Sequence, residues 1–279
     1  MAGTGADILA ELQGLAKGPV QTAMWWLGQA GWALRGNGTT LLIDPFLSDT
    51  HNRAVPTPLA AEAATGIDAI LCTHEHVDHL DGPSVPALAA ASPDARFVVP
   101  APIVRMVVDL GVHASRVIGT QPGEAIEIGG LTIHPLPARH GVVMADAYTF
   151  GKELSGGLYR YLGFVVDAGG ARVYHAGDTI LYEGMEQRLR ELRVDVALVP
   201  INGRDGIREA AGLVGNLDER EAAWLAAEAG ARLLIPMHYE MFTRNRGYPS
   251  KVLDAIDREG WKVDVLVPGK EHPFVYTRP

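Results

Sequence analysis

The chain has 279 residues, of which 47% are hydrophobic and 20% charged, and its formal net charge at pH 7 is -9. This composition is typical of a folded globular protein with a sizeable core and excludes an intrinsically disordered one. The negative charge, together with the lack of a run of Lys or Arg, opposes the positive field that nucleic-acid binding requires. We therefore expect no nucleic acid partner.

The cysteine content and the first residues bear on the compartment. Cys72 is the one cysteine of the chain, so no internal disulfide can form, which favours a reducing environment. Asp7 and Glu11 stand where a secretory signal peptide would be apolar. No apolar run reaches the roughly 20 residues that a membrane-spanning helix needs. We expect a cytoplasmic protein without a membrane partner, folded as a single domain over residues 1–279.

Residues 1–19 are expected to form an N-terminal helical extension of that domain. Ile8, Leu9 and Leu12 recur at helical spacing, and a Gly-Pro pair ends the pattern. Such an amphipathic helix must cover an apolar surface. That surface could belong to this chain's own core or to a neighbouring subunit.

Beyond this helix the predicted elements fall into two similar halves. Runs rich in aromatic and branched residues predict antiparallel strands at the start, and strands alternating with helices follow in each half. The predicted strands are 22–31, 32–36, 39–45, 68–73, 96–100, 124–128, 131–137, 161–170, 172–178, 195–202, 232–238 and 262–268. The predicted helices are 83–91, 101–111, 182–191, 218–229 and 249–258. Two packed sheets with helices on their outer faces account for the two similar halves, so we predict an α/β fold, a four-layer αββα sandwich.

Candidate metal ligands stand at the ends of four predicted strands. They are His74, His140, Asp178 and His238. In α/β folds functional groups gather beyond the carboxyl ends of strands, because the sheet fixes the backbone there while the side chains are free of the core. Segments far apart in the sequence can therefore converge on one site.

The densest cluster of such residues is THEHVDH at 73–79. His74 and His76 are two residues apart, so they project to one side of an extended segment and can hold one cation. Asp78 and His79 begin the next turn and face a second cation. Imidazole and carboxylate ligands suit Zn²⁺, Mn²⁺ or Fe²⁺. Asp78 occupies the place of the second histidine of HExxH, which excludes a thermolysin-like site.

The HxHxDH motif at 74–79, a later histidine at His140, HAGD at 175–178 and IPMH at 235–238 together resemble the metallo-β-lactamase superfamily. The resemblance covers most of the chain and implies its αββα fold. It implies a first metal site of His74, His76 and His140, a second of Asp78, His79 and His238, a bridging Asp178, and an Asp44 that orients the ligand loop.

A closer resemblance is to the L-ascorbate-6-phosphate lactonase-like branch, and it is carried by AMWWLGQAG at 23–31, PINGR at 200–204 and GNLDEREA at 215–222. It implies a hydrolase with two divalent cations, Zn²⁺ or Mn²⁺ before Fe²⁺. Water activated between them would open a lactone or related ester, with Asp78 or Asp178 relaying the proton. The substrate would be a small sugar-like molecule, with or without a phosphate, and the protein a homo-oligomer.

Two other functions stay open. RNA-processing members of the superfamily share all the ligands, so a nuclease-like phosphodiesterase is the alternative activity, against which the acidic charge weighs. In a non-catalytic metal-binding module, protein groups would close the coordination sphere. Seven ligands for two metals leave room for solvent, which favours catalysis.

Several of the histidines, together with Asp178 and Cys72, could have a structural role in place of a metal-binding one. His140 stands at a strand end and His134 inside the strand, so we favour His140 as the ligand and His134 as a buried, hydrogen-bonded residue. Asp178 could cap the following helix instead of bridging two metals. His175 is interpreted as a packed strand residue and Cys72 as a small apolar one. The remaining histidines are interpreted as surface or loop residues: His51, His113 and His272.

The residues that would contact a substrate are less well defined by the sequence. Arg204 and Arg208 follow a predicted strand and could hold an anionic group by forked hydrogen bonds, or form surface ion pairs with their acidic neighbours. Asn202 and Tyr239 are candidates to donate to an oxyanion. The loop 141–158 could be a mobile lid over the pocket or only a long connection.

Overall fold

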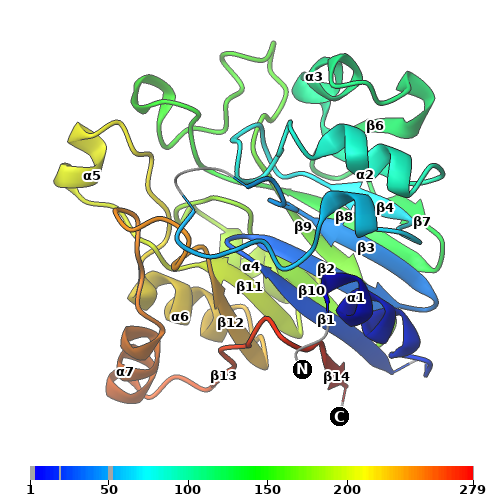
Figure 1. Ribbon diagram of the computed structural model, residues 1–279. Helices are drawn as coiled ribbons and strands as arrows, with labels where there is room; N and C mark the ends of the chain where they lie inside the picture. Colours follow the sequence, from blue (N-terminus) through cyan, green and yellow to red (C-terminus); the bar gives the residue numbers. More distant parts are fainter. Residues whose placement is uncertain (1–3, 19, 50–52, 279) are drawn as a thin grey trace.

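The computed structural model describes residues 4–18, 20–49 and 53–278. Within these ranges two seven-stranded sheets pack together, with helices on both outer faces (Figure 1), which confirms the predicted αββα sandwich. In spatial order, the first sheet consists of β14 (Phe274–Thr277), β1 (Gln21–Gly28), β2 (Gly31–Gly36), β3 (Thr39–Ile43), β4 (Ala69–Leu71), β5 (Arg96–Pro100) and β6 (Val117–Thr120). The second consists of β13 (Asp264–Val265), β12 (Leu233–Met237), β11 (Val196–Pro200), β10 (Arg172–His175), β9 (Leu162–Asp167), β8 (Leu131–Pro137) and β7 (Ile126–Ile128).

The helices divide between the two sheets. The first sheet is covered by α1 (Gly5–Gly14), α2 (Val85–Ala91) and α3 (Val104–Asp109), and the second by α4 (Met185–Glu191), α6 (Glu219–Glu228) and α7 (Pro249–Glu259) (Figure 1). The short α5 (Gly206–Ala210) lies in the connection after β11, and 3-10 turns occur at η1 (Ala61–Ala63), η2 (Ala101–Ile103), η3 (Ala114–Arg116) and η4 (Met144–Asp146). Among the helices of the described ranges, none has both the length and the apolar character that crossing a membrane takes.

The strands of the first sheet are apolar on both faces, as β1 illustrates. Its side chains alternate between two clusters: Trp25 and Leu27 pack under the helices, whereas Met24 and Trp26 face the second sheet. Both faces are therefore buried, and this is why the segment reads as a nearly continuous apolar run instead of an alternating one.

The predicted N-terminal helix is present as α1. Thr4 and Asp7 form its N-terminal cap, because the Thr4 N–H donates to Asp7 Oδ2 over 2.8 Å and the Asp7 N–H donates to Thr4 Oγ1 over 3.3 Å. Ile8, Leu9 and Leu12 are buried in the cluster beneath the first sheet's helices. The apolar face of α1 thus covers this chain's own core, and the homo-oligomer stays a prediction.

Among the strands and α-helices of the described ranges, three short ones were not predicted, namely β6, β14 and α5. The strand β14 lies at the edge of the first sheet and pairs antiparallel with β1, so that Tyr276 lies opposite Thr22. Most residues of these two edge strands are half-buried or exposed, which weakens the apolar signal. The predicted strand 262–268 is likewise present only as the short β13.

The direction of the strands determines where their ends meet. The strands β8 and β10 both pair antiparallel with β9, while β10, β11 and β12 pair parallel in series. The strands β8, β10 and β12 therefore run in one direction, and their carboxyl ends lie along one edge of the second sheet. The segment after β4 reaches this edge from the first sheet, where the Leu162 N–H donates to the Thr73 carbonyl over 3.1 Å.

Candidate metal centre

The loops after β4, β8, β10 and β12 bring all seven predicted ligands together. Within each of two adjacent groups, the candidate ligand atoms lie within 4.8 Å of one another. The side chains are buried, except for that of His76, which is partly exposed. The first ligand group consists of His74, His76, His140 and Asp178, and the second ligand group consists of Asp78, His79 and His238.

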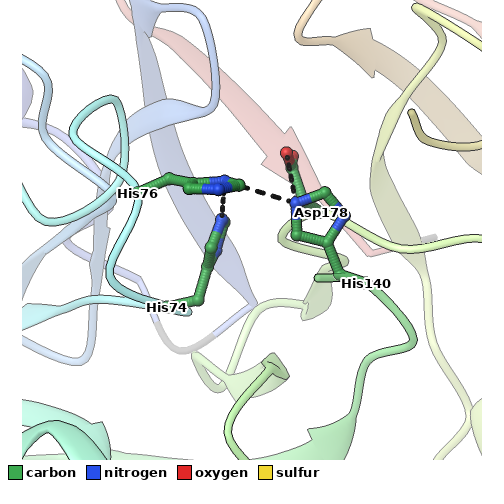
Figure 2. Close-up of side chains that lie close together, drawn as sticks. All are labelled: His74, His76, His140 and Asp178. Atoms are coloured by element: carbon green, nitrogen blue, oxygen red, sulfur yellow. Dashed lines mark hydrogen bonds and ion pairs between the residues drawn. The ribbon is translucent and has the colours of Figure 1, made fainter. Parts of the chain in front are cut away.

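In the first ligand group, three imidazoles and one carboxylate face one another (Figure 2). His74 Nε2 lies 2.9 Å and His140 Nε2 lies 3.3 Å from His76 Nδ1. Asp178 Oδ2 lies 3.4 Å from His140 Nε2. Imidazole nitrogens and a carboxylate oxygen are ligands that Zn²⁺, Mn²⁺ and Fe²⁺ accept, so this donor set fits a divalent cation.

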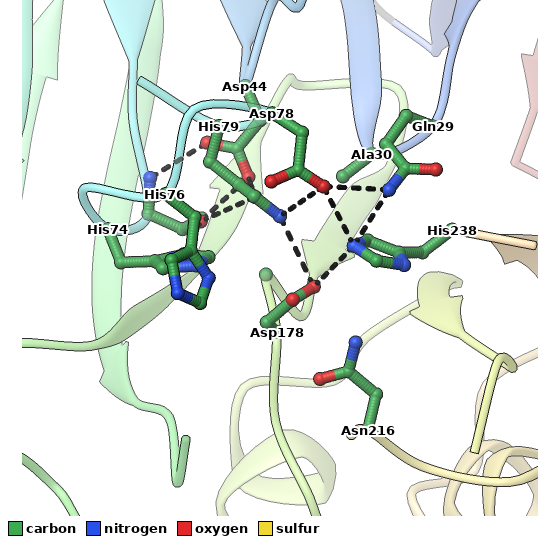
Figure 3. Close-up of polar contacts among 12 residues, drawn as sticks. Gln29, Ala30, Asp44, His74, His76, Asp78, His79, Asp178, Asn216 and His238 are labelled. Atoms are coloured by element: carbon green, nitrogen blue, oxygen red, sulfur yellow. Dashed lines mark hydrogen bonds and ion pairs between the residues drawn. The ribbon is translucent and has the colours of Figure 1, made fainter. Parts of the chain in front are cut away.

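In the second ligand group, carboxylates surround two imidazoles (Figure 3). Asp78 Oδ2 lies 3.3 Å from His238 Nε2 and 3.8 Å from His79 Nε2. Asp178 Oδ1 lies 3.2 Å from His238 Nε2 and 3.3 Å from His79 Nε2. Because the other oxygen of Asp178 faces the first ligand group, this residue presents one oxygen to each group, as a bridging ligand does.

Hydrogen bonds orient two of the histidines toward the centre. Asp44 Oδ2 accepts from Nδ1 of His79 over 2.7 Å, which leaves the His79 Nε2 lone pair free for a metal. Asp44 is itself held by Thr73, whose N–H and hydroxyl donate to it over 2.8 and 2.7 Å. His76 Nε2 donates to the Val142 carbonyl over 2.9 Å, so its Nδ1 faces the centre. The predicted orienting role of Asp44 agrees with these contacts.

Burial and charge set the protonation of the ligands. Burial lowers the pKa of His140 to about 3, so this imidazole is neutral at neutral pH. Burial also opposes protonation of His238, but the Asp178 and Asp78 carboxylates raise its pKa to about 10. Burial alone would raise the pKa of Asp178, yet His238 and His79 hold it well below its ordinary value.

These shifts describe a buried anionic site that needs positive charge. Without a cation, protons on His79 and His238 supply it; a divalent cation would take their place and release them. His79 Nε2 and Asp178 Oδ1 are buried and lie 3.3 Å apart, but neither atom forms a hydrogen bond among the described residues. Buried polar atoms that lack a hydrogen bond are costly, so their presence at this point fits a metal-binding centre.

Gln29 contacts the second ligand group and was not singled out from the sequence. Its side-chain Nε2 lies 2.7 Å from Asp78 Oδ2 and 3.0 Å from His238 Nε2 (Figure 3). Its carbonyl accepts from the His238 N–H over 3.0 Å, and its backbone has a left-handed φ of 52°. In the sequence, Gln29 is the one polar residue of the run AMWWLGQAG. The residues around it do not indicate that its side chain contacts Asp78.

A cavity of about 740 Å³ opens beside the two ligand groups. His76, Asp78, Asp178 and His238 contribute to its lining, so the centre is accessible to a small molecule. The other lining residues belong mainly to the connections after β11 and β12. They are Val77, Val142, Ala211, Gly212, Leu213, Val214, Phe242, Thr243, Arg244 and Asn245.

The two arginines predicted to hold a substrate anion are engaged elsewhere. The Arg204 guanidinium donates to both carboxylate oxygens of Glu221, each over 2.6 Å. Arg208 pairs with Asp205 over 3.1 Å and donates to the Asn202 carbonyl. Neither arginine lines the cavity. These contacts favour the ion-pair alternative for both residues.

The two predicted oxyanion donors do not line the cavity. Asn202 is buried, its Nδ2 donates to Asn245 over 3.0 Å, and its Oδ1 accepts from Asn216 over 3.0 Å. Tyr239 stacks on Trp26 with ring centroids 5.4 Å apart, and neither Asn202 nor Tyr239 lines the cavity. The amide that reaches the cavity is that of Asn245.

The loop 141–158 is tied to the centre through its first half. The backbones of His140 and Thr149 form a β-bridge, and the Val142 carbonyl accepts from His76. The Tyr148 hydroxyl donates to Glu209 Oε1 over 2.7 Å, which joins this loop to α5. The lid and the plain connection both stay open as predictions.

The structure also tests the structural, non-catalytic roles that the sequence suggested for individual residues. Asp178 does not cap a helix, since α4 begins with Gly184 as its N-cap. His134 lies outside both ligand groups in β8, but it is half-buried, so the prediction of a buried residue was wrong. His175 is buried and contacts the Ala30 carbonyl over 2.7 Å. Cys72 is buried, His113 and His272 are exposed, and His51 lies outside the described residues.

Known proteins resemble this chain over most of its length. The family of beta-lactamase superfamily domains matches residues 39–239. A UPF0173 metal-dependent hydrolase of Archaeoglobus fulgidus is 32% identical over 252 residues, which cover 89% of this chain and 97% of that protein. A probable L-ascorbate-6-phosphate lactonase of Salmonella paratyphi B is 25% identical over 84% of this chain and 74% of that protein.

Among solved structures, that of Igni18, a metallo hydrolase from Ignicoccus hospitalis, has a TM-score of 0.71 at 22% identity and covers 93% of this chain and 100% of its own. This likeness shows a shared fold. The family match spans more than half of the chain, and it includes all seven residues of the two ligand groups. The chain therefore belongs to the beta-lactamase superfamily and, within it, to the metal-dependent hydrolases.

Proposed function

We propose that the protein opens a lactone or related ester of a small substrate with the help of two divalent cations. The observation that carries the proposal is the position of Asp178, which presents one oxygen to each ligand group at the side of an accessible cavity. The similarity to a probable lactonase, at 25% identity over 84% of this chain, supports the choice of bond.

The residues present fit two cations, one in each ligand group and with Asp178 between them. Zn²⁺ or Mn²⁺, with Fe²⁺ as a third candidate, would supply Lewis acidity that polarises the ester carbonyl and acidifies water. The protein's part is to hold the ligands in place, which Asp44 does for His79 and the Val142 carbonyl does for His76.

Asp78 is the better placed of the two carboxylates proposed to move a proton. Its contacts with His79, His238 and Gln29 are all made by Oδ2. Asp178 uses one oxygen for each ligand group. Since Asp78 also lines the cavity, its Oδ1 is the atom that we assign to accept the proton of the attacking water.

The openness of the centre favours catalysis over a structural metal site. Structural sites are closed by protein ligands, whereas a catalytic site keeps a position for water or substrate. Here four ligands face a cavity of about 740 Å³. A volume of this size accommodates a small molecule.

The experiment is a comparison of substrate classes with one preparation. A panel of lactones, followed with a pH indicator, is measured beside bis-p-nitrophenyl phosphate, using metal-loaded protein and the same protein after chelation. We expect lactone hydrolysis that is lost on chelation and restored by Zn²⁺ or Mn²⁺. Hydrolysis of the phosphodiester alone would favour the phosphodiesterase, and no hydrolysis of either class would favour the metal-binding module.

A further inference from the structure

The wall of the cavity combines apolar side chains with one guanidinium. Val142, Leu213, Val214 and Phe242 supply the apolar part. Arg244 is the one Lys or Arg among the described residues that line the cavity. A ligand that fills this space therefore meets the metal centre, an apolar surface and one guanidinium.

Arg244 differs from the arginines that the sequence had suggested. Carboxylates neutralise Arg204 and Arg208, whereas in the described ranges no ion pair or hydrogen bond engages the Arg244 guanidinium. A guanidinium stays charged at any physiological pH, and its planar fork matches the oxygens of a carboxylate or phosphate. Arg244 is exposed and lines the cavity, so its guanidinium is accessible to an anion that enters.

The two residues that follow Arg244 are held by hydrogen bonds, whereas the Arg244 guanidinium has no such contact in the described part of the chain. Asn245 accepts from Asn202 Nδ2 over 3.0 Å, and the Arg246 carbonyl accepts from Arg208 Nη2 over 2.9 Å. Arg208 therefore supports the loop after β12 instead of contacting a substrate. This support fixes the backbone of Arg244, so less order has to be imposed when an anion binds.

We propose that Arg244 binds an oxyanion of the substrate, a carboxylate or a phosphate, while an apolar body of the same molecule contacts Val142, Leu213 and Phe242. The inference rests on the proposed function, since the ester carbonyl must then lie at the metal centre. It narrows the substrate class to small anionic esters or lactones with an apolar body. The apolar body is a feature that the sugar-like substrate implied by the sequence resemblance lacks, and it is proposed because Val142, Leu213 and Phe242 line the cavity.

Direct binding tests Arg244 without any turnover. Metal-loaded protein is titrated calorimetrically with 4-phenylbutanoate, with 3-phenylpropyl phosphate and with the neutral 4-phenylbutanamide. The wild type should bind at least one anion about tenfold more tightly than the amide, and Arg244→Gln should lose that preference, since hydrogen bonds to charged groups have this strength. The anion that binds with the lower Kd identifies the oxyanion as carboxylate or phosphate. Arg244→Lys should keep part of the preference for the anion over the amide.

Arg246→Gln is the matched control, because Arg246 lies in the same loop, is exposed and does not line the cavity. Its anion affinity should equal that of the wild type, and all variants should hold the same metal content. Equal anion affinity of the wild type and Arg244→Gln, or equal weakening in both variants, would overturn the inference. If Arg244 binds the anion but no ester or lactone is hydrolysed, the proposed function fails and the anion site remains.

Discussion

The two ligand groups share Asp178 but differ in their electrostatics. In the first ligand group, His74 and His140 are surrounded mainly by other imidazoles, and burial lowers the pKa of both. In the second ligand group, burial is outweighed by carboxylates, and the pKa values of His79 and His238 rise. The same residue type at one centre is therefore a ready neutral ligand in one group and a protonated one in the other. The neighbouring charges, rather than burial, make this difference.

The largest expected effect comes from removing the residue that both groups share. Asp178→Ala takes one carboxylate oxygen from each group, so both should lose metal. We expect the metal content to fall in both sites and activity to drop by more than the roughly 10–100-fold typical of residues that only support a ligand. Elemental analysis and the hydrolysis assay measure the two effects.

His76→Ala is the matched variant for one group, because His76 contacts His74 and His140 but not the second ligand group. It should lower the metal content less than Asp178→Ala does, and the activity should fall together with the metal content. Full metal content in either variant would contradict the ligand assignment.

Removing the cations with a chelator should lower the free energy of unfolding of the protein. The metal-free centre keeps several charged groups buried, and at a metal concentration about 1,000 times the Kd the bound cation contributes about 4 kcal/mol of stability per site. Each site that is emptied should therefore lower Tm by roughly 10 °C for a domain of this size. Thermal unfolding before and after chelation measures it, with Zn²⁺ added back as the control. An unchanged Tm would argue that the cations are not bound within the core.

Gln29→Leu should weaken the second ligand group selectively. The substitution removes the amide that contacts Asp78 and His238 while nearly preserving volume. We expect a loss of about 10–100-fold in the affinity for one of two cations, with the other unchanged. Competitive metal titration with a chromophoric chelator resolves the two affinities. Gln187→Leu on the exposed part of α4 is the control and should bind both cations normally. Equal weakening of both sites would break the assignment of Gln29 to the second group.

The pH dependence of metal binding compares the two ligand groups directly and, per pH unit, is the smallest of these effects. His238, with its pKa of about 10, carries a proton at neutral pH that a cation must displace. Affinity at the second ligand group should thus rise about tenfold per pH unit for each proton displaced, up to that pKa. In the metal-free protein the protonated His238 stabilises the carboxylates below its pKa, and this contribution is lost as the pH rises through about 10.

His140, with its pKa of about 3, is already deprotonated, so the first ligand group should show little dependence. Proton release on metal addition, measured by calorimetry in buffers of different ionisation enthalpy, tests the difference between the groups. Release of no protons would contradict the charge distribution described for the second group.

The sequence by itself determined the sandwich fold and the seven candidate ligands. Both depend on local patterns in the sequence. Apolar runs indicate strands, and a His or Asp just after such a run lies at the edge of a sheet whatever the later course of the chain. His74 and Asp178 could be identified for this reason. Short edge strands such as β6 and β14 were missed, because their half-exposed residues carry little apolar signal.

The tertiary structure alone decided which polar side chains are free to act. Arg204 stands in a motif that resembles a lactonase, but α6 brings Glu221 against it. Arg244 stands in an unremarked loop, and the fold places it in the cavity without a carboxylate partner among the described residues. Gln29 meets Asp78 only because the β1–β2 turn lies beside the loop after β4. Pairing of charges and amides depends on which loops the packed sheets bring together, and the spacing within any one loop does not contain that information.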